Sequence, residues 1–319
     1  MSVRTSDVVV VGAGPAGLTV ACGLRRSGRR VVVLDDGRSA AREIDHVGNY
    51  PGRAPGLPGQ ALLQELLQQL DAAHGTVTDR CIASIERVDG GFELPGEWHR
   101  LRFRCLVLAT GCGDPAPAIP GLQGVRYRQR LWHRSMGNEA MLAGRRVAVV
   151  GGARAVADAL FLAHAGAVVT LFDSDADAAC ESRLECCAQP IRKLLCPTSG
   201  EVVARLADQS LRRFDWLCVA SAREPRVELA LALGVALAPD GHVLISSSCA
   251  TSVPGVYAVG DVASPCGQLA IAVGHGAIAA DAINRRFDEG RDDIETGPAF
   301  ARPGWSGIAP GIVASGATP

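Results

Sequence analysis

One glycine-rich motif occurs twice in this chain, once intact and once altered. In the first copy an apolar strand runs into G-x-G-x-x-G at Gly12, Gly14 and Gly17. Gly12 permits a tight turn, Gly14 lets backbone N–H groups approach a pyrophosphate at the positive end of the next helix, and Gly17 lets that helix pack on the strand. A second apolar strand ends at Asp35, where a carboxylate can bind a ribose hydroxyl. This spacing predicts a βαβ unit that binds a dinucleotide.

The second copy keeps its strand but not its glycines. It begins with Gly151 and Gly152, and Ala153 and Val156 then replace the middle glycine and the closing small residue. A methyl group stands where backbone should meet pyrophosphate, and a branched side chain stands where the helix should pack closely. Two such units indicate a flavoprotein with a second domain for a nicotinamide donor, and the altered second copy predicts that this donor binds poorly.

Composition narrows the class of protein. The 319 residues suffice for two domains, and a net charge of -1 gives no sign of nucleic-acid binding. No apolar run is long enough to span a membrane, and the polar first residues do not resemble a signal peptide. The 11 cysteines are scattered and form no C-x-x-C, which favours a cytoplasmic chain with reduced thiols and no metal site. We interpret the adjacent Cys186 and Cys187 as incidental, because neighbouring cysteines form a strained disulfide.

The two motifs organise the chain into an α/β fold. We expect two Rossmann-like three-layer domains, with the nicotinamide-type domain inserted into the first. Late in the sequence, an apolar strand precedes Gly260-Asp261, and we expect this strand to belong to the first domain again. The expected segments are 1–115 and 244–290 for the first domain, 116–243 for the inserted domain, and 291–319 for an irregular tail.

Three motifs together resemble the low-molecular-weight thioredoxin reductase family of pyridine-nucleotide flavoproteins. They are residues 12–17, then Ala109-Thr110-Gly111 before a proline-rich crossing, then 259–261 followed by 268–270. The similarity covers about residues 6–287 and implies FAD as cofactor and a homodimer.

The resemblance also implies which residues bind FAD. Asp261 would contact the flavin ribityl chain, a helix N-terminus near Gln268 would face the flavin pyrimidine, and Asn49 would contact the flavin. The full expected set is Gly12, Gly14, Pro15, Ala16, Gly17, Asp35, Asp36, Asn49, Ile82, Thr110, Gly111, Gly260, Asp261, Gln268, Leu269 and Ala270.

The chain departs from the family at the places where electrons would enter and leave. The redox C-x-x-C should precede the second glycine motif, yet the sequence has no cysteine between Cys112 and Cys180. Thiol–disulfide exchange needs two thiols, so reduction of thioredoxin is not expected. The pair Asp173 and Asp175 stands where the family binds the 2′-phosphate of NADPH, and this charge suits NADH better.

Two residues of the crossing are candidate catalytic groups. His133 follows the crossing, beside the expected place of the flavin. Because histidine side chains can exchange protons near neutral pH, it is a candidate acid–base group, with a surface or packing role as the alternative. Trp132 either fills core volume or stacks on the flavin or the substrate.

Three functions remain open at this point. The first is an FAD-dependent oxidoreductase that oxidises a small or carrier-bound substrate directly at the flavin, with O2 or another electron acceptor. The second is an NADH-dependent reductase of a ferredoxin, a quinone or a small molecule. The third is a redox-neutral, isomerase-like or non-catalytic flavoprotein. None of them involves nucleic acid or a membrane.

Overall fold

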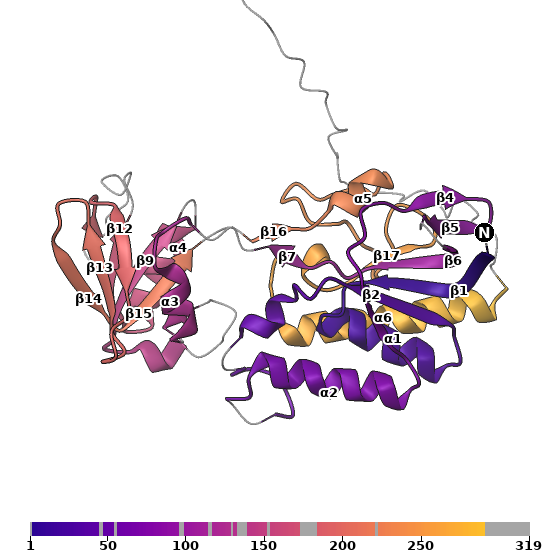
Figure 1. Ribbon diagram of the computed structural model, residues 1–319, viewed down its shortest axis with the longest axis horizontal. Helices are drawn as coiled ribbons and strands as arrows, with labels where there is room; N and C mark the ends of the chain where they lie inside the picture. The colour runs from indigo at the N-terminus through magenta and orange to yellow at the C-terminus, as the bar shows by residue number, and fades with distance from the viewer. Residues whose placement is uncertain are drawn as a thin grey trace, which may run out of the picture.

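A computed structural model of the chain (Figure 1) describes residues 2–44, 47–53, 56–95, 99–113, 117–128, 130–132, 139–151, 154–172, 184–220 and 223–290. It contains two α/β units, each built on its own mostly parallel sheet. The expected fold of two Rossmann-like three-layer domains is confirmed.

The first sheet has the strand order β3-β2-β1-β6-β5-β4, and β17 pairs with β6. Its members are β1 (Ser2–Val11), β2 (Val31–Asp35), β3 (Val77–Asp79), β4 (Glu86–Val88), β5 (Gly91–Leu94), β6 (His99–Leu108) and β17 (Val256–Ala258). Strand β1 runs parallel to both β2 and β6, and β17 runs parallel to β6. The carboxyl ends of these strands therefore meet at one edge, where ligands bind in open α/β sheets.

Both faces of the first sheet are covered. Alternate residues of β1 point to opposite faces, so Val8 and Val10 pack against α1 (Pro15–Arg26), α2 (Gly59–Ala72) and α6 (Leu269–Asp288), and Val9 and Val11 face the other layer. That other layer includes α5 (Glu228–Ala232), and Phe92 and Leu94 of the sheet's antiparallel strand β5 face it as well. Burial on both faces explains why β1 is apolar at successive positions.

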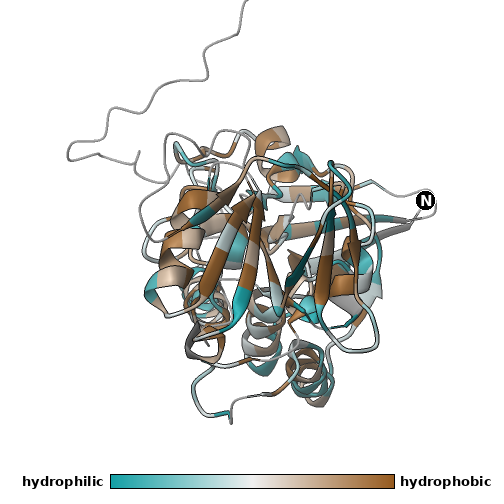
Figure 2. Ribbon diagram, turned by 90° about the vertical axis from the view of Figure 1, so that its left-hand side faces the viewer, coloured by the Kyte–Doolittle hydropathy of each residue, from teal (hydrophilic) through white to brown (hydrophobic). Residues whose placement is uncertain are grey.

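The second sheet has the all-parallel strand order β11-β10-β9-β15-β8. Its members are β8 (Leu131–Trp132), β9 (Arg146–Gly151), β10 (Val168–Phe172), β11 (Glu185–Cys187) and β15 (Trp216–Ala220). Helix α4 (Ala155–His164) covers one face. Helix α3 (Leu122–Tyr127) and the antiparallel sheet of β12 (Ile191–Leu195), β13 (Val202–Leu206) and β14 (Leu211–Phe214) cover the other. Figure 2 looks onto this domain and shows apolar segments along its strands.

Two short strands connect the domains. The chain leaves the first domain through β7 (Cys112–Gly113) and returns through β16 (Glu224–Pro225), and these strands pair with each other. Short 3-10 helices lie at η1 (Ala40–Glu43), η3 (Glu139–Leu142) and η5 (Gly260–Ala263).

The return to the first domain falls earlier than the sequence pattern indicates. Leu229, Ala230, Val235 and Val243 pack against the first sheet, whereas the pattern places residues up to 243 in the inserted domain. These residues supply the apolar cover that the second face of the first sheet needs, and the short helix α5 gives no clear periodic signal.

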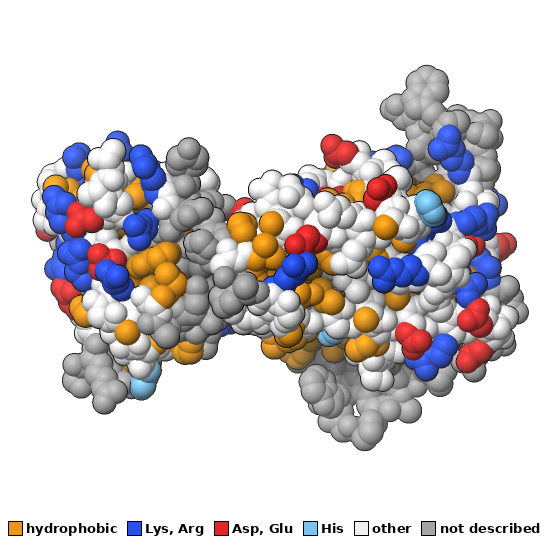
Figure 3. Space-filling view, turned by 90° about the horizontal axis from the view of Figure 1, so that it is seen from below, with side chains coloured by type: hydrophobic (Ala, Val, Ile, Leu, Met, Phe, Trp, Pro, Cys, Tyr) orange, Lys and Arg blue, Asp and Glu red, His pale blue; other side chains and the backbone are white. Residues whose placement is uncertain are grey.

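Figure 3 shows apolar side chains on both sides of the waist between the two domains, with charged side chains spread over the outer surfaces. No helix in the described part of the chain is both long and apolar enough to cross a bilayer.

Candidate cofactor and active site

A cavity of about 1000 Å³ opens at the carboxyl edge of the first sheet and reaches the second domain. This volume lies at the upper end of the usual range for ligand pockets. The first domain contributes Gly12, Gly14, Asp35, Thr110 and Asp261 to its lining, and the second domain contributes Leu131, Arg154, Asp158, Phe161, Cys218 and Val219.

The glycine turn forms one wall of this cavity. Gly12 has a φ of 107°, and a Cβ there would lie 2.2 Å from the Ala109 carbonyl oxygen of the neighbouring strand. A Cβ on Gly17 would lie 1.9 Å from the Gly12 oxygen. At Gly14 the nearest atom is the Ser39 hydroxyl at 3.3 Å, and φ is an ordinary -74°. Gly12 and Gly17 are therefore required by the fold, whereas Gly14 leaves space in front of the α1 N-terminus.

Two carboxylates follow β2. Asp35 accepts hydrogen bonds from the backbone N–H groups of Ala13, at 2.8 Å, and Gly37, at 3.0 Å, which hold it beside the glycine turn. Asp36 is ion-paired with Arg38. The hydrogen bond from the Arg38 guanidinium lowers the pKa of Asp36 below its ordinary value, so this carboxylate stays charged.

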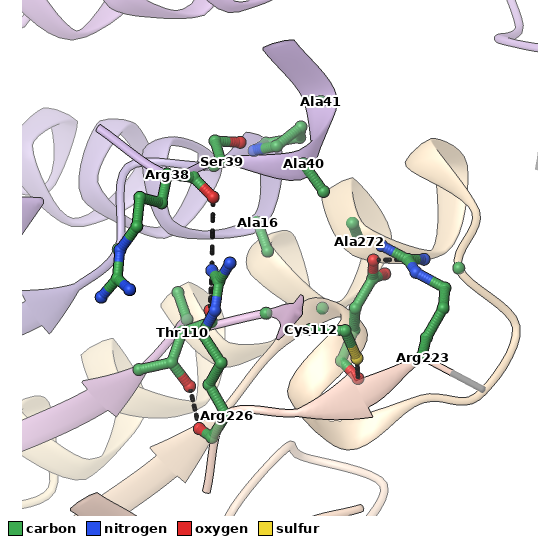
Figure 4. Close-up of a pocket in the computed structure, with 18 of the residues that line it drawn as sticks. Ala16, Arg38, Ser39, Ala40, Ala41, Thr110, Cys112, Arg223, Arg226 and Ala272 are labelled. Carbon is green, nitrogen blue, oxygen red and sulfur yellow. Dashed lines mark hydrogen bonds and ion pairs between the residues drawn. The ribbon is translucent and has the colours of Figure 1, made fainter. Parts of the chain in front are cut away.

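The opposite wall combines the ends of β6 and β17. Asp261 is ion-paired with Arg223 at 2.9 Å, and its backbone oxygen accepts a hydrogen bond from the Cys112 thiol at 3.2 Å. Gly260 has a φ of 74°, and a Cβ there would lie 2.9 Å from the Ala16 methyl group. Helix α1 thus approaches this wall closely, and residues of both walls line the same cavity (Figure 4).

The start of α6 brings two predicted residues together. Gln268 is the N-cap residue, and its side-chain oxygen accepts a hydrogen bond from the Asn49 amide at 2.7 Å. Leu269 lines the cavity, whereas Ala270 is exposed. This helix N-terminus therefore lies at the cavity wall, where its dipole favours negative charge.

Most of the residues expected to bind FAD lie in this one lining. They are Gly12, Gly14, Pro15, Ala16, Asp35, Asp36, Ile82, Thr110, Gly111, Gly260, Asp261, Gln268 and Leu269. Gly17, Asn49 and Ala270 do not line it: Gly17 packs α1 on its strand, and Asn49 acts through Gln268. The first-domain end of the cavity thus fits a dinucleotide such as FAD, with space at Gly14 and a polar edge at Asp35.

The candidate catalytic residues are placed differently. Trp132 lies in β8 with 0% exposure, within the core of the second domain and with its ring 6.5 Å from that of Phe161. Trp132 does not line the cavity, so it does not stack on a flavin or a substrate there. Its position agrees with the alternative, in which it fills core volume. The next residue, His133, lies outside the described residues.

The second glycine motif keeps one glycine for a structural reason. Gly151 has a φ of 143°, and a Cβ there would lie 2.6 Å from the Ala220 oxygen of β15. Val156 is partly buried against the core of its own domain. Ala153, Asp173 and Asp175 lie outside the described residues. Gly151 is needed for strand packing whether or not a nucleotide binds.

Four of the described cysteines line the cavity. Cys81, Cys112, Cys218 and Cys266 are reduced thiols, so none of them takes part in a disulfide. The expectation that all thiols are reduced needs one correction, because Cys186 is disulfide-bonded. Its neighbour Cys187 is a reduced thiol, so the two adjacent cysteines are not bonded to each other.

Several arginines of the lining were not predicted from the sequence. They are Arg38, Arg80, Arg154, Arg223 and Arg226. Arg223 and Arg226 lie on either side of β16, a few residues after β15 ends at Ala220. Two arginines so soon after a buried strand were the signal that could have revealed them.

Comparison with known proteins agrees with this architecture. A model of the family described as pyridine nucleotide-disulphide oxidoreductase matches residues 6–194 and 196–279. One of the subunits of alkyl hydroperoxide reductase in Pseudomonas putida is 30% identical over 299 residues, which cover 86% of this chain and 56% of that protein, so the chain spans little more than half of that relative. Thioredoxin reductase of Coxiella burnetii is 25% identical over 322 residues, covering 88% of this chain and 96% of that protein. The crystal structure of HlmI has a TM-score of 0.80 and 28% identity, covering 91% of this chain and 95% of that chain.

Proposed function

The chain belongs to the pyridine nucleotide-disulphide oxidoreductase family, whose members bind FAD, and on this premise we propose that it oxidises a small or carrier-bound substrate directly at the flavin. In this proposal no disulfide relays electrons between flavin and substrate.

One observation carries the proposal: a single cavity connects the dinucleotide turn with the second domain, and the thiols that line it lie on separate elements. Cys112 belongs to β7, Cys218 belongs to β15, and Cys266 precedes α6. The sequence contains no C-x-x-C. Since the sequence thus lacks the C-x-x-C that would relay electrons, we expect the substrate itself to approach the flavin.

The residues of the cavity suggest how such a substrate is held. Bound FAD would supply two-electron redox chemistry: the two electrons and two protons that leave the substrate would pass in the end to O2 or another acceptor. Arg154 and Asp158, 3.9 Å apart, offer a polar surface on the second-domain wall, and Phe161 offers an apolar one. We keep His133 as the proposed proton-handling residue, because removal of a substrate proton requires a base.

Reductive titration under anaerobic conditions tests the absence of a relay. FAD alone takes up two electrons, so about one equivalent of dithionite per FAD should bleach the flavin completely; a coupled disulfide would require about two equivalents. The Cys186→Ser variant is the matched control, because it removes the disulfide-bonded cysteine of the second domain. If the wild type needs about two equivalents and Cys186→Ser does not change this, an electron relay exists and the proposal fails.

A second candidate is an NADH-dependent reductase. The unit of β9, α4 and β10 and its Gly151 turn are retained, and this is the place where the family binds its nicotinamide donor. Rapid mixing with reduced nicotinamide nucleotides separates the two candidates. In either case the resemblance leads us to propose a homodimer, which sedimentation analysis can check.

A further inference from the structure

Arg226 joins three segments that surround the dinucleotide turn. It follows β16, on the crossing that returns from the second domain. Its backbone N–H donates to the Gly111 oxygen at 2.9 Å, and its backbone oxygen accepts a hydrogen bond from the Thr110 hydroxyl at 2.7 Å. The backbone of Arg226 is thereby fixed to the end of β6.

The side chain of Arg226 spans the cleft from this anchor. Its Nη1 donates to the backbone oxygens of Arg38 and Thr110, each at 3.2 Å. Figure 4 shows the guanidinium standing between these two residues. Arg38 follows β2 and Thr110 follows β6, so one guanidinium group bridges the loops on either side of β1.

Both bridged loops touch the glycine turn. The Ser39 hydroxyl, next to Arg38, is the nearest atom to the space in front of Gly14. The Thr110 nitrogen lies 3.4 Å from the position of a Cβ on Gly12. Arg226 therefore lies across the same turn whose backbone N–H groups face a pyrophosphate in dinucleotide-binding folds.

Within the described part of the chain, Arg226 has no ion-pair partner and keeps N–H donors without an acceptor, although its charge contributes to the lowered pKa of the nearby Asp36. The donors without an acceptor there are those of Nε and Nη2. By contrast, Arg38 is paired with Asp36 and Arg223 with Asp261 in the same cavity. A partly buried guanidinium with free N–H donors is well suited to bind a phosphate oxygen.

We propose that Arg226 binds the diphosphate of FAD and closes the cleft over it, so that the chain returning from the second domain takes part in holding the cofactor. The α1 N-terminus would contact the diphosphate from one side and the Arg226 guanidinium from the other. This inference concerns how FAD is held and does not depend on the substrate or the acceptor of the proposed function.

Binding of nucleotide fragments to the full-length apoprotein tests this assignment. Isothermal titration calorimetry with FAD, ADP and adenosine separates contacts with phosphate from contacts with adenine and ribose. For Arg226→Gln we expect the Kd for FAD and for ADP to rise about tenfold or more, because a charge-assisted hydrogen bond is lost. The Kd for adenosine should stay within about twofold, since adenosine carries no phosphate. Arg226→Lys, which keeps the charge but not the planar fork, should fall between wild type and Arg226→Gln.

The matched control is Arg42→Gln. Arg42 is an exposed residue of η1, close in sequence to Arg38, and it is not part of the cavity lining. The ADP affinity of Arg42→Gln should stay within about twofold of wild type, because an exposed charge outside the cavity holds no phosphate.

Three results would overturn the assignment. They are an unchanged ADP affinity in Arg226→Gln, an equal loss of adenosine affinity, which would reveal a purely structural effect, and an equal loss of ADP affinity in Arg42→Gln, which would reveal a general charge effect. If Arg226→Gln does not fold, Arg226→Lys decides by the same comparison of ADP with adenosine.

Discussion

The two glycines of the first turn should respond differently to the same added methyl group. Gly14 has a φ of -74°, and the nearest atom to a new Cβ is the Ser39 hydroxyl at 3.3 Å. The backbone conformation suits alanine and the hydroxyl can shift slightly, so Gly14→Ala should change the free energy of unfolding of the apoprotein by less than about 1 kcal/mol. The methyl would nevertheless occupy the space into which a phosphate must come.

The cost of this methyl group for FAD binding follows from the hydrogen bonds that it obstructs. Loss of one charge-assisted backbone hydrogen bond to phosphate, worth about 1.5–3 kcal/mol, weakens binding roughly 10- to 150-fold. Gly14→Val would block the space further and should give colourless protein.

Gly12→Ala should damage the fold instead. A non-glycine residue at a φ of 107° is strained, at a cost of about 1–3 kcal/mol. The new Cβ would also lie 2.2 Å from the Ala109 oxygen, so the end of β1 would have to move away from the end of β6. This movement adds about 1–3 kcal/mol to the loss of stability, as at other overpacked sites. The sum, about 2–6 kcal/mol, is a large part of the stability of an ordinary domain.

Urea unfolding of the apoproteins and the FAD dissociation constant, measured by flavin fluorescence, check both effects. If Gly14→Ala binds FAD within about threefold of wild type, the turn does not face the diphosphate and the cofactor assignment is refuted. If Gly12→Ala is as stable as wild type, the reasoning about the strand contact is wrong.

Four further predictions follow from the site and the sequence. NADPH should bind more weakly than NADH and not in the low micromolar range at physiological salt, as measured by titration calorimetry; tight NADPH binding would show that the altered motif still works. Replacing Cys112 and Cys266 together by serine should leave turnover of the substrate intact and thioredoxin reduction absent, and a large loss of turnover would place a thiol in the reaction. The hydrogen bond and ion pair with Arg38 lower the pKa of Asp36 from its ordinary value, so the charged carboxylate stabilises the fold above about pH 4, and this stabilisation is lost as the pH falls through the lowered pKa. Asp36→Asn should therefore reduce the drop in Tm between about pH 5 and pH 3, and an unchanged drop would argue against this contribution. His133→Ala should retain its flavin and lose turnover by on the order of a hundredfold, and normal turnover would end its catalytic assignment.

Much of the first domain could be predicted because its signals are local. The turn at Gly12 and the carboxylate of Asp35 belong to one βαβ unit, and their spacing fixes their geometry. Thr110 and Asp261 could be placed beside them because parallel strands bring their carboxyl ends to one edge.

The remaining parts of the site depend on contacts between distant segments. Arg226 donates a hydrogen bond to the backbone oxygen of Arg38, which lies 188 positions earlier in the chain, and the sequence does not indicate such a contact. Trp132 had two plausible environments, a core and a cofactor face, and an apolar residue on a short strand does not distinguish them. The domain return was misplaced for a related reason, because α5 is too short for its periodicity to show which sheet it covers.

The central claim is that the flavin meets its substrate directly and does not receive electrons from a bound nicotinamide nucleotide. The most direct test is to mix the FAD-loaded protein with NADH, and separately with NADPH, in an anaerobic stopped-flow instrument while the flavin absorbance is followed. We predict no bleaching by either nucleotide on the timescale of turnover. Rapid bleaching by NADH would contradict the claim and identify the protein as a nicotinamide-dependent reductase.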